Sequence, residues 1–164
     1  MKTISEKEVW AAVETSWKEL SKNYQPDHIV AISHGGDSVG DLFSELSSVP
    51  LSKILIQRPD RKPLYKKLVK INKHFAWFMY ELLFLLDKPK IIERIIIPQN
   101  KNILIVDDGV HTGKTIQVCV NFLKRFHPKS TFVFSLMDIS KNKLSNYSHY
   151  NEKITFPWSE NYIN

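Results

Sequence analysis

Two adjacent carboxylates, Asp107 and Asp108, stand at the end of a short apolar run, residues 103–106, that is rich in β-branched side chains. Such a run predicts a buried strand of a parallel sheet. Residues 109–115 are small or hydrogen-bonding and lead into a helical pattern. Amides gathered at a helix N-terminus bind anions through free N–H groups and the positive end of the helix dipole. Carboxylates beside such a cradle indicate a ligand that carries a phosphate together with hydroxyls or a metal ion.

The loop allows two interpretations. GVHTGKT, residues 109–115, is close to a Walker A phosphate loop, but that pattern needs a glycine five positions before Gly113, where this chain has Asp108. The spacing therefore argues against an ATPase loop. The stretch instead resembles the phosphoribosyl-diphosphate (PRPP) signature of the type I phosphoribosyltransferases, which has a hydrophobic strand, two acidic residues, two usually apolar residues, a variable position and Thr-Gly-x-Thr.

This resemblance implies an α/β fold with a parallel twisted sheet flanked by helices and a small hood formed by the termini. It also implies an enzyme that transfers ribose 5-phosphate from PRPP to a nucleobase, with release of pyrophosphate and dependence on Mg²⁺. Asp107 and Asp108 would accept hydrogen bonds from the ribose hydroxyls, act in catalysis and hold the Mg²⁺ ion. The PRPP-binding loop would comprise Val110, His111, Thr112, Gly113, Lys114 and Thr115.

A second loop follows the apolar run at residues 28–33 and reads Ser33, His34, Gly35, Gly36. Two glycines after a strand let main-chain N–H groups approach a ligand. In the family that the chain resembles, a loop of the form small-[Arg/Lys]-Gly-Gly at this place binds the pyrophosphate of PRPP. His34 stands where the family has a permanent cation. The family also keeps a lid after its next strand, which makes Arg58 and Lys62 lid candidates.

The C-terminal segment, residues 138–164, is predicted to form the hood. Phe156-Pro157-Trp158 loosely resembles the closing segment of the xanthine/guanine/hypoxanthine branch of the family. This resemblance implies that Phe156 and Trp158 bind the base, that the base is a purine, and that an indole face is available for stacking. The alternative is that Trp158 anchors the C-terminus to the core. That branch has a lysine for the 6-oxo group near Leu136, and this chain has none there.

His111 fills the variable position of the signature, where purine-specific relatives often carry an aspartate. Neutral imidazole accepts a proton and imidazolium donates one near neutral pH, so His111 can serve as an acid/base for the base nitrogen. The alternative is a histidine that points at solvent without a catalytic role. Both interpretations stay open at the level of sequence.

The elements that position these residues can be read from local patterns. Ser5-x-x-Glu8 is a capping box that opens a helix, and apolar runs at residues 51–57, 91–97 and 130–137 predict further strands. Strands alternating with helices predict a parallel sheet with ligand groups at the C-terminal ends of its strands. Residues 65–86 predict one long helix that is apolar on nearly all sides. We expect such a helix to cover the sheet and to contact a second subunit or the hood, so a homodimer or higher oligomer is predicted.

Composition limits the remaining possibilities. The 164 residues predict a single domain, 1–164, with 43% hydrophobic residues. The net charge of +6 suits a polyanionic substrate, and no nucleic-acid motif accompanies it, so nucleic acid is not an expected partner. The longest apolar run, residues 75–86, is too short to span a bilayer, and no membrane partner is expected. The N-terminus shows no signal peptide, which predicts a cytoplasmic protein, and Cys119 is expected to be a buried apolar thiol.

Two functions other than catalysis are also compatible with the sequence. One is a PRPP or nucleotide sensor without turnover, which is suggested by the departures at His34, Gly109, His111 and Leu136. The other is a basic RNA-binding regulator on the same fold.

Overall fold

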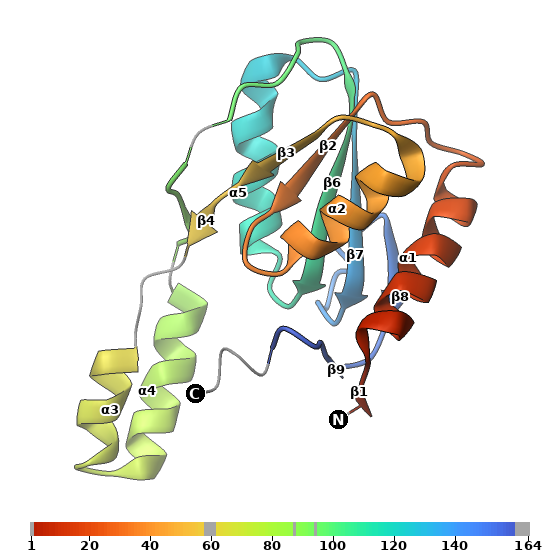
Figure 1. The fold of residues 1–164 in the computed structure, drawn as a ribbon. Coiled ribbons are helices and arrows are strands. Elements are labelled where there is room, and N and C mark those ends of the chain that lie inside the picture. The colour runs from red at the N-terminus through yellow and green to blue at the C-terminus, as the bar shows by residue number, and fades with distance from the viewer. Residues whose placement is uncertain (1, 58–61, 87, 94, 160–164) are drawn as a thin grey trace.

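A five-stranded, entirely parallel sheet forms the centre of the computed structural model, which describes residues 2–57, 62–86, 88–93 and 95–159. The strand order is β3-β2-β6-β7-β8 (Figure 1). The strands are β2 (His28–Ile32), β3 (Leu51–Ile54), β6 (Asn102–Val110), β7 (Ser130–Asp138) and β8 (Tyr147–Tyr150). The predicted fold class is therefore confirmed.

Helices cover both faces of this sheet (Figure 1). On one face lie α1 (Glu6–Leu20) and α2 (Gly36–Ser47), where the rings of Phe43 and Phe134 meet edge to face at 4.6 Å between centroids. On the other lie α5 (Lys114–Leu123) and the 3₁₀ turn Lys124–Phe126. Cys119 of α5 is fully buried, and burial raises the pKa of its thiol to about 12. The thiol therefore stays protonated and inert, as the sequence predicted.

The start of α1 has the predicted capping box. Ser5 Oγ accepts a hydrogen bond from the backbone N–H of Glu8 at 3.3 Å, and Glu8 Oε2 accepts one from the backbone N–H of Ser5 at 2.8 Å. Two N–H groups that the helix itself cannot satisfy are thus paired.

The strand that carries the acidic pair is longer than its apolar run. Strand β6 continues to Val110 because it keeps its parallel register with β7, in which Asp107 lies opposite Ser135 and Gly109 opposite Met137. The carboxylates therefore lie within the last part of a central strand, and its hydrogen bonds hold their backbone in place.

The two ends of the chain meet in a second, small sheet. Strand β1 (Lys2–Thr3) pairs in parallel with β9 (Ile154–Thr155). The backbone N–H of Ile154 also donates to Met137 Sδ at 3.2 Å, which fastens β9 to the end of β7. Of the segment predicted as the hood, residues 138–164, β9 thus lies beside the C-terminal end of β7, whereas Tyr147–Tyr150 form β8, the edge strand of the central sheet. A hood role for the segment stays a prediction.

The long helix predicted at residues 65–86 is instead a helical hairpin of α3 (Lys62–Val69) and α4 (Lys73–Leu86). Asn72 explains the break, because its Oδ1 accepts hydrogen bonds from the backbone N–H groups of His74 at 2.9 Å and Phe75 at 3.0 Å. An asparagine that caps the start of a helix in this way ends the preceding one.

The hairpin lies between β4 (Ile56–Gln57) and β5 (Lys90–Ile91) in the sequence, and these two short strands pair in antiparallel orientation. The hairpin extends away from the central sheet (Figure 1). The single strand predicted at residues 51–57 is thus divided at Leu55 into β3 and β4. Among the described residues of the strand predicted at 91–97, only Ile91 is in a strand, as the end of β5. Its partner β4 has two residues, and Ile96 is 90% exposed.

The expected cover of the sheet by the predicted helix is also not observed, since Phe75, Trp77 and Phe78 of α4 are exposed. Each hairpin helix packs mainly against the other. Among the described residues, no helix has the length and apolar character needed to cross a membrane.

Candidate active site

The two predicted ligand loops meet at the C-terminal ends of β2 and β6. A Cβ atom added to Gly35 would overlap the carboxylate of Asp108, and one added to Gly36 would lie 2.9 Å from the carbonyl oxygen of Val106. Only glycine lets the first loop lie this close to the acidic pair. The structure therefore brings together two segments that are about seventy residues apart in the sequence.

The loop before α2 is held by its own side chains. Ser33 Oγ donates to Asp37 Oδ1 at 3.1 Å, and the backbone N–H of His34 donates to Asp37 Oδ2 at 3.3 Å. His34 has a φ of 83°, an unfavourable conformation for a residue with a side chain. His34 Nε2 is hydrogen-bonded to Gln57 Nε2 at 3.0 Å, which connects this loop to β4.

The second loop, residues 111–113, ends at the start of α5. Gly113 is the N-cap residue, has a φ of 70° and has no side chain to accept from the first amides of the helix. These amides and the positive end of the helix dipole face the loop, which suits an anion. A Cβ at Gly113 would overlap the side chain of Leu144, so the segment after β7 packs against this turn.

Asp108 is nearly buried, and its carboxylate accepts a hydrogen bond from Trp158 Nε1 at 2.7 Å. Burial raises the pKa of Asp108, while hydrogen bonds that its carboxylate accepts from Trp158, from the Asp107 side chain and from backbone N–H groups oppose this increase. The backbone N–H of Asp108 also donates to Asp107 Oδ1 at 3.0 Å. The pair thus offers carboxylate oxygens beside the Gly35 loop.

Beside Asp108 lies a cavity of about 420 Å³. Its wall includes His111 and Phe156, two of the predicted site residues. Thr155 Oγ1 is buried without a hydrogen-bond partner among the described residues, and Thr155 also lines this cavity. A buried hydroxyl without a partner is costly, so this position favours a ligand with a hydrogen-bonding group.

Lys153 lines the same cavity, together with Gly109, Met137, Ile154 and Ser159. The sequence analysis missed Lys153 and Thr155, because their place depends on the pairing of β9 with β1 from the other end of the chain. No pattern of neighbouring residues predicts the pairing of β1 with β9.

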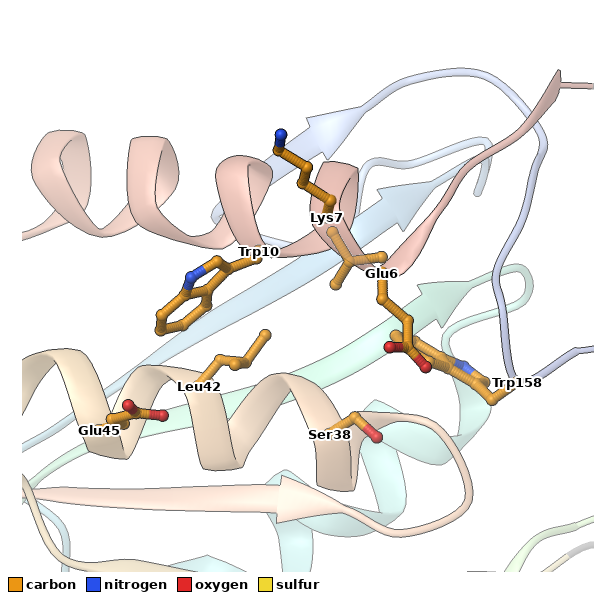
Figure 2. Close-up of a pocket in the computed structure, with 8 residues that line it drawn as sticks. Glu6, Lys7, Trp10, Ser38, Leu42, Glu45 and Trp158 are labelled. Carbon is orange, nitrogen blue, oxygen red and sulfur yellow. The ribbon is translucent and has the colours of Figure 1, made fainter.

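Trp158 lies between this site and a second cavity, of about 500 Å³, between α1 and α2 (Figure 2). Figure 2 shows Trp10 and Trp158 at opposite ends of that cavity, with Leu42 below Trp10 and Glu6 next to Trp158. The ring of Trp158 stacks on Phe156 at 5.3 Å between centroids and 13° between planes. Phe156 thus lines the cavity beside Asp108, whereas Trp158 lies behind it, and a base-binding role for either stays a prediction.

The structure describes only one of the two lid candidates. Arg58 lies outside the described residues, and the backbone of Lys62 starts α3. The place where the resemblance implies a lid is thus the beginning of the helical hairpin, and a lid role for either residue stays a prediction.

Asp138, which the sequence analysis did not single out as a functional residue, organises the segment after β7. Its carboxylate accepts hydrogen bonds from the backbone N–H and Oγ of Ser140 and from the backbone N–H and Oγ of Ser145. Although burial alone would raise the pKa of Asp138, these hydrogen bonds lower it to about 2 from its usual 3.8. The resulting turn carries Leu144 to its contact with Gly113.

We expect Asp138→Asn to destabilise the protein by about 2 kcal/mol at pH 7. Because the pKa of Asp138 is lower in the folded than in the unfolded state, its stabilising effect is complete above about pH 4 and is lost as pH falls towards 2. Urea unfolding of the variant and the parent across this range measures the effect. Asp41→Asn, which removes an exposed ion pair with Lys53, is the control and should change stability little. A difference that stays constant from pH 7 to pH 2 would contradict the expectation.

With this geometry in hand, the sequence was compared with known families, and residues 4–161 match the family model described as phosphoribosyl transferase domain. The chain belongs to the phosphoribosyltransferase family. The family predicted from the order of residues at 103–115 is therefore confirmed. No curated protein sequence matches this chain.

Solved structures of phosphoribosyltransferases share the fold. A purine phosphoribosyltransferase from Pyrococcus horikoshii is 21% identical, with a TM-score of 0.73 over 96% of this chain and 92% of its own. The Helicobacter pylori xanthine-guanine-hypoxanthine phosphoribosyltransferase is 16% identical, with a TM-score of 0.73 over 98% of this chain and 95% of its own. A hypothetical protein from Neisseria gonorrhoeae, solved with bound ppGpp, is 14% identical, with a TM-score of 0.69 over 96% and 89%.

Proposed function

We propose that this phosphoribosyltransferase transfers ribose 5-phosphate from PRPP to a nucleobase, with a purine as the favoured class, and releases pyrophosphate. The observation that carries the proposal is the close approach of the Gly35 loop to Asp108, next to a cavity of about 420 Å³. A phosphate-binding turn, an acidic pair and a base-sized cavity thus lie side by side. The purine phosphoribosyltransferases among its structural relatives support the substrate class.

In this proposal each loop holds one end of PRPP. The amides at the start of α5 and the hydroxyls of Thr112 and Thr115 bind the 5-phosphate, and the amides around Gly35 and Gly36 bind the pyrophosphate. Asp107 and Asp108 accept hydrogen bonds from the ribose hydroxyls. Their negative charge stabilises the positive charge that develops on the ribose ring as the bond to pyrophosphate breaks.

A Mg²⁺ ion suits the same carboxylates. Within the described part of the chain, no cluster of three or more histidine, cysteine, aspartate or glutamate side chains could form a complete metal site. Magnesium is commonly held by one or two carboxylates together with phosphate oxygens of the substrate, and Asp107 and Asp108 provide oxygens of this kind. When bound, the ion would neutralise charge on the leaving pyrophosphate.

The cavity beside Asp108 favours an acceptor base that carries an oxo group. Lys153 supplies a cation there, although the chain has Leu136 and Met137 where the branch it resembles has a lysine. Thr155 Oγ1 lacks a partner among the described residues. Phe156 adds an apolar wall for a ring. Lys153, Thr155 and Phe156 all belong to the predicted hood segment, residues 138–164, and the proposal therefore assigns recognition of the base to this segment.

The direct test is to mix the protein with PRPP and Mg²⁺ and to measure pyrophosphate release with hypoxanthine, guanine, xanthine, adenine and uracil. We expect release with at least one oxopurine. Ligand-dependent stabilisation by PRPP without release with any base would instead favour the non-catalytic sensor. RNA retention that weakens with salt, without either response, would favour the RNA-binding regulator.

We expect Lys153→Met to raise KM for an oxopurine roughly 10- to 100-fold, because a hydrogen bond to a charged group contributes about 1.5–3 kcal/mol. KM for PRPP should stay unchanged, since Lys153 lies in the base cavity and outside both phosphate loops. Lys153→Arg should restore part of the affinity, and Lys129→Met, at an exposed site, is the control. Equal increases in both KM values would argue against a base-reading role.

The homodimer and the cytoplasmic location expected from the sequence stay predictions. Light scattering at micromolar concentration measures the first.

A further inference from the structure

The α3–α4 hairpin holds most of the positive charge of the chain. The hairpin, residues 62–86, contains five lysines and one acid, Glu81, which gives a formal charge of +4. The whole chain carries +6, so all other residues together contribute only +2. The lysines Lys67, Lys70 and Lys73 are exposed near the turn between the helices. The charge is therefore a local property of the hairpin.

The same hairpin exposes large apolar side chains. Ile71 is 80% exposed, and on α4 Phe75 is 51%, Trp77 61% and Phe78 58% exposed. Ala76 is fully buried, which marks the side of α4 that packs within the hairpin. Exposed aromatic and aliphatic side chains in one place, bordered by lysines, indicate a surface that another body covers.

We propose that the hairpin binds the surface of a membrane that contains anionic lipids. Ile71, Phe75, Trp77 and Phe78 would enter the boundary between head groups and acyl chains, where tryptophan is favoured. The surrounding lysines would lie among the head groups, where each contributes about 1 kcal/mol at an anionic surface. Helix α4 has 14 residues, so it lies along the surface and does not cross the bilayer.

Charge separates this partner from the alternatives. A second copy of the chain would bring one hairpin of charge +4 against another, and the two like charges would repel. A nucleic acid would pair with the lysines through its phosphates but would leave Ile71 and the aromatic rings in water. An anionic lipid surface accommodates both groups of side chains.

The strand that precedes the hairpin contacts the candidate active site. Gln57 of β4, one of the two strands on which the hairpin stands, is hydrogen-bonded to His34 of the first ligand loop at 3.0 Å. Surface binding would therefore hold this loop near the membrane. The lipid-binding proposal does not depend on the proposed reaction, since vesicle binding and pyrophosphate release are measured separately.

The test uses the full chain with two kinds of vesicle, phosphatidylcholine alone and phosphatidylcholine with about 30% phosphatidylglycerol, in co-sedimentation. We expect binding to the anionic vesicles only, reduced strongly by about 0.5 M NaCl. Tryptophan fluorescence should shift to shorter wavelength on binding, and Trp77→Phe should remove most of this shift. Absence of binding to anionic vesicles, or equal binding to both kinds, would overturn the proposal.

Two triple variants then test whether binding depends on the hairpin lysines or on the net charge of the chain. Lys67→Glu/Lys70→Glu/Lys73→Glu should weaken vesicle binding at least roughly tenfold. Lys124→Glu/Lys129→Glu/Lys141→Glu, with the same change in net charge at exposed sites outside the hairpin, should bind nearly as the parent does. Equal losses in both triple variants would overturn the assignment to the hairpin.

The apolar part is tested by Ile71→Ser/Phe75→Ser, with Ile92→Ser/Ile96→Ser as the control at exposed sites outside α3 and α4. The first pair should lose vesicle binding and the second should keep it, while thermal unfolding confirms that both are folded. A stable dimer of the parent that the first pair converts to monomer would assign the surface to a second copy and would refute lipid binding.

Discussion

Asp107→Asn/Asp108→Asn is expected to reduce pyrophosphate release roughly 10³-fold or more, because the variant loses both carboxylates that would face the ribose. Thermal unfolding without ligand should occur at the same or a higher temperature than in the parent. Burial raises the pKa of Asp108, so its ionised form destabilises the fold, and this cost grows as pH rises above the usual pKa of an aspartate. Removing the charge removes the cost, while a misfolded variant would melt earlier.

The control for this pair is Asp41→Asn/Glu45→Gln, which makes the same change in net charge at exposed positions of α2. It should keep full activity. If the Asp107/Asp108 variant also keeps full activity, the ribose-binding role of the acidic pair is wrong, whatever the base specificity.

His111→Asn is expected to lower turnover roughly a hundredfold or more if the histidine exchanges a proton with the base nitrogen. His111 lines the cavity of about 420 Å³ together with Asp108, so its ring borders the space assigned to the acceptor. The rate of the parent should then show an ionisation at about pH 6 to 7, the ordinary range of a histidine, and the variant should lack it. Initial rates from pH 5 to pH 9 at saturating PRPP and base measure both effects.

His127→Asn provides a matched control, since His127 is exposed after the 3₁₀ turn and asparagine tolerates its φ of 48°. This variant should keep the pH profile of the parent. If His111→Asn keeps both rate and profile, His111 is a spectator, and the proton of the acceptor goes to water or to another side chain.

The parts of this molecule that could be predicted from sequence are those encoded by neighbouring residues. The order of side chains around Asp107 and Asp108 identified the family, and the spacing of Ser5 and Glu8 identified the start of α1. Each depends on contacts a few residues apart. The alternation of helices and strands was likewise enough to predict the parallel sheet.

The parts that could not be predicted depend on contacts between distant residues or on one weak local signal. Lys153 and Thr155 reach the cavity beside Asp108 only because β9 pairs with β1 across nearly the whole chain. The break before α4 depends on Asn72, whose capping role is hidden by an apolar pattern that continues on both sides of it. The buried network of Asp138 required the return of Ser145 to the same carboxylate.

The burial of Asp107 and Asp108 at the end of β6 has a consequence for how long the protein survives in a cell. Folding removes the Asp107 carboxyl and much of the Asp108 carboxyl from water, which lowers the stability of the folded state and raises the fraction of molecules open to proteases. A ligand that supplies hydroxyls or a cation to these groups binds only the folded state and lowers that fraction. We therefore expect the cellular half-life to follow the supply of substrate, so that the amount of protein increases with demand without any change in its synthesis.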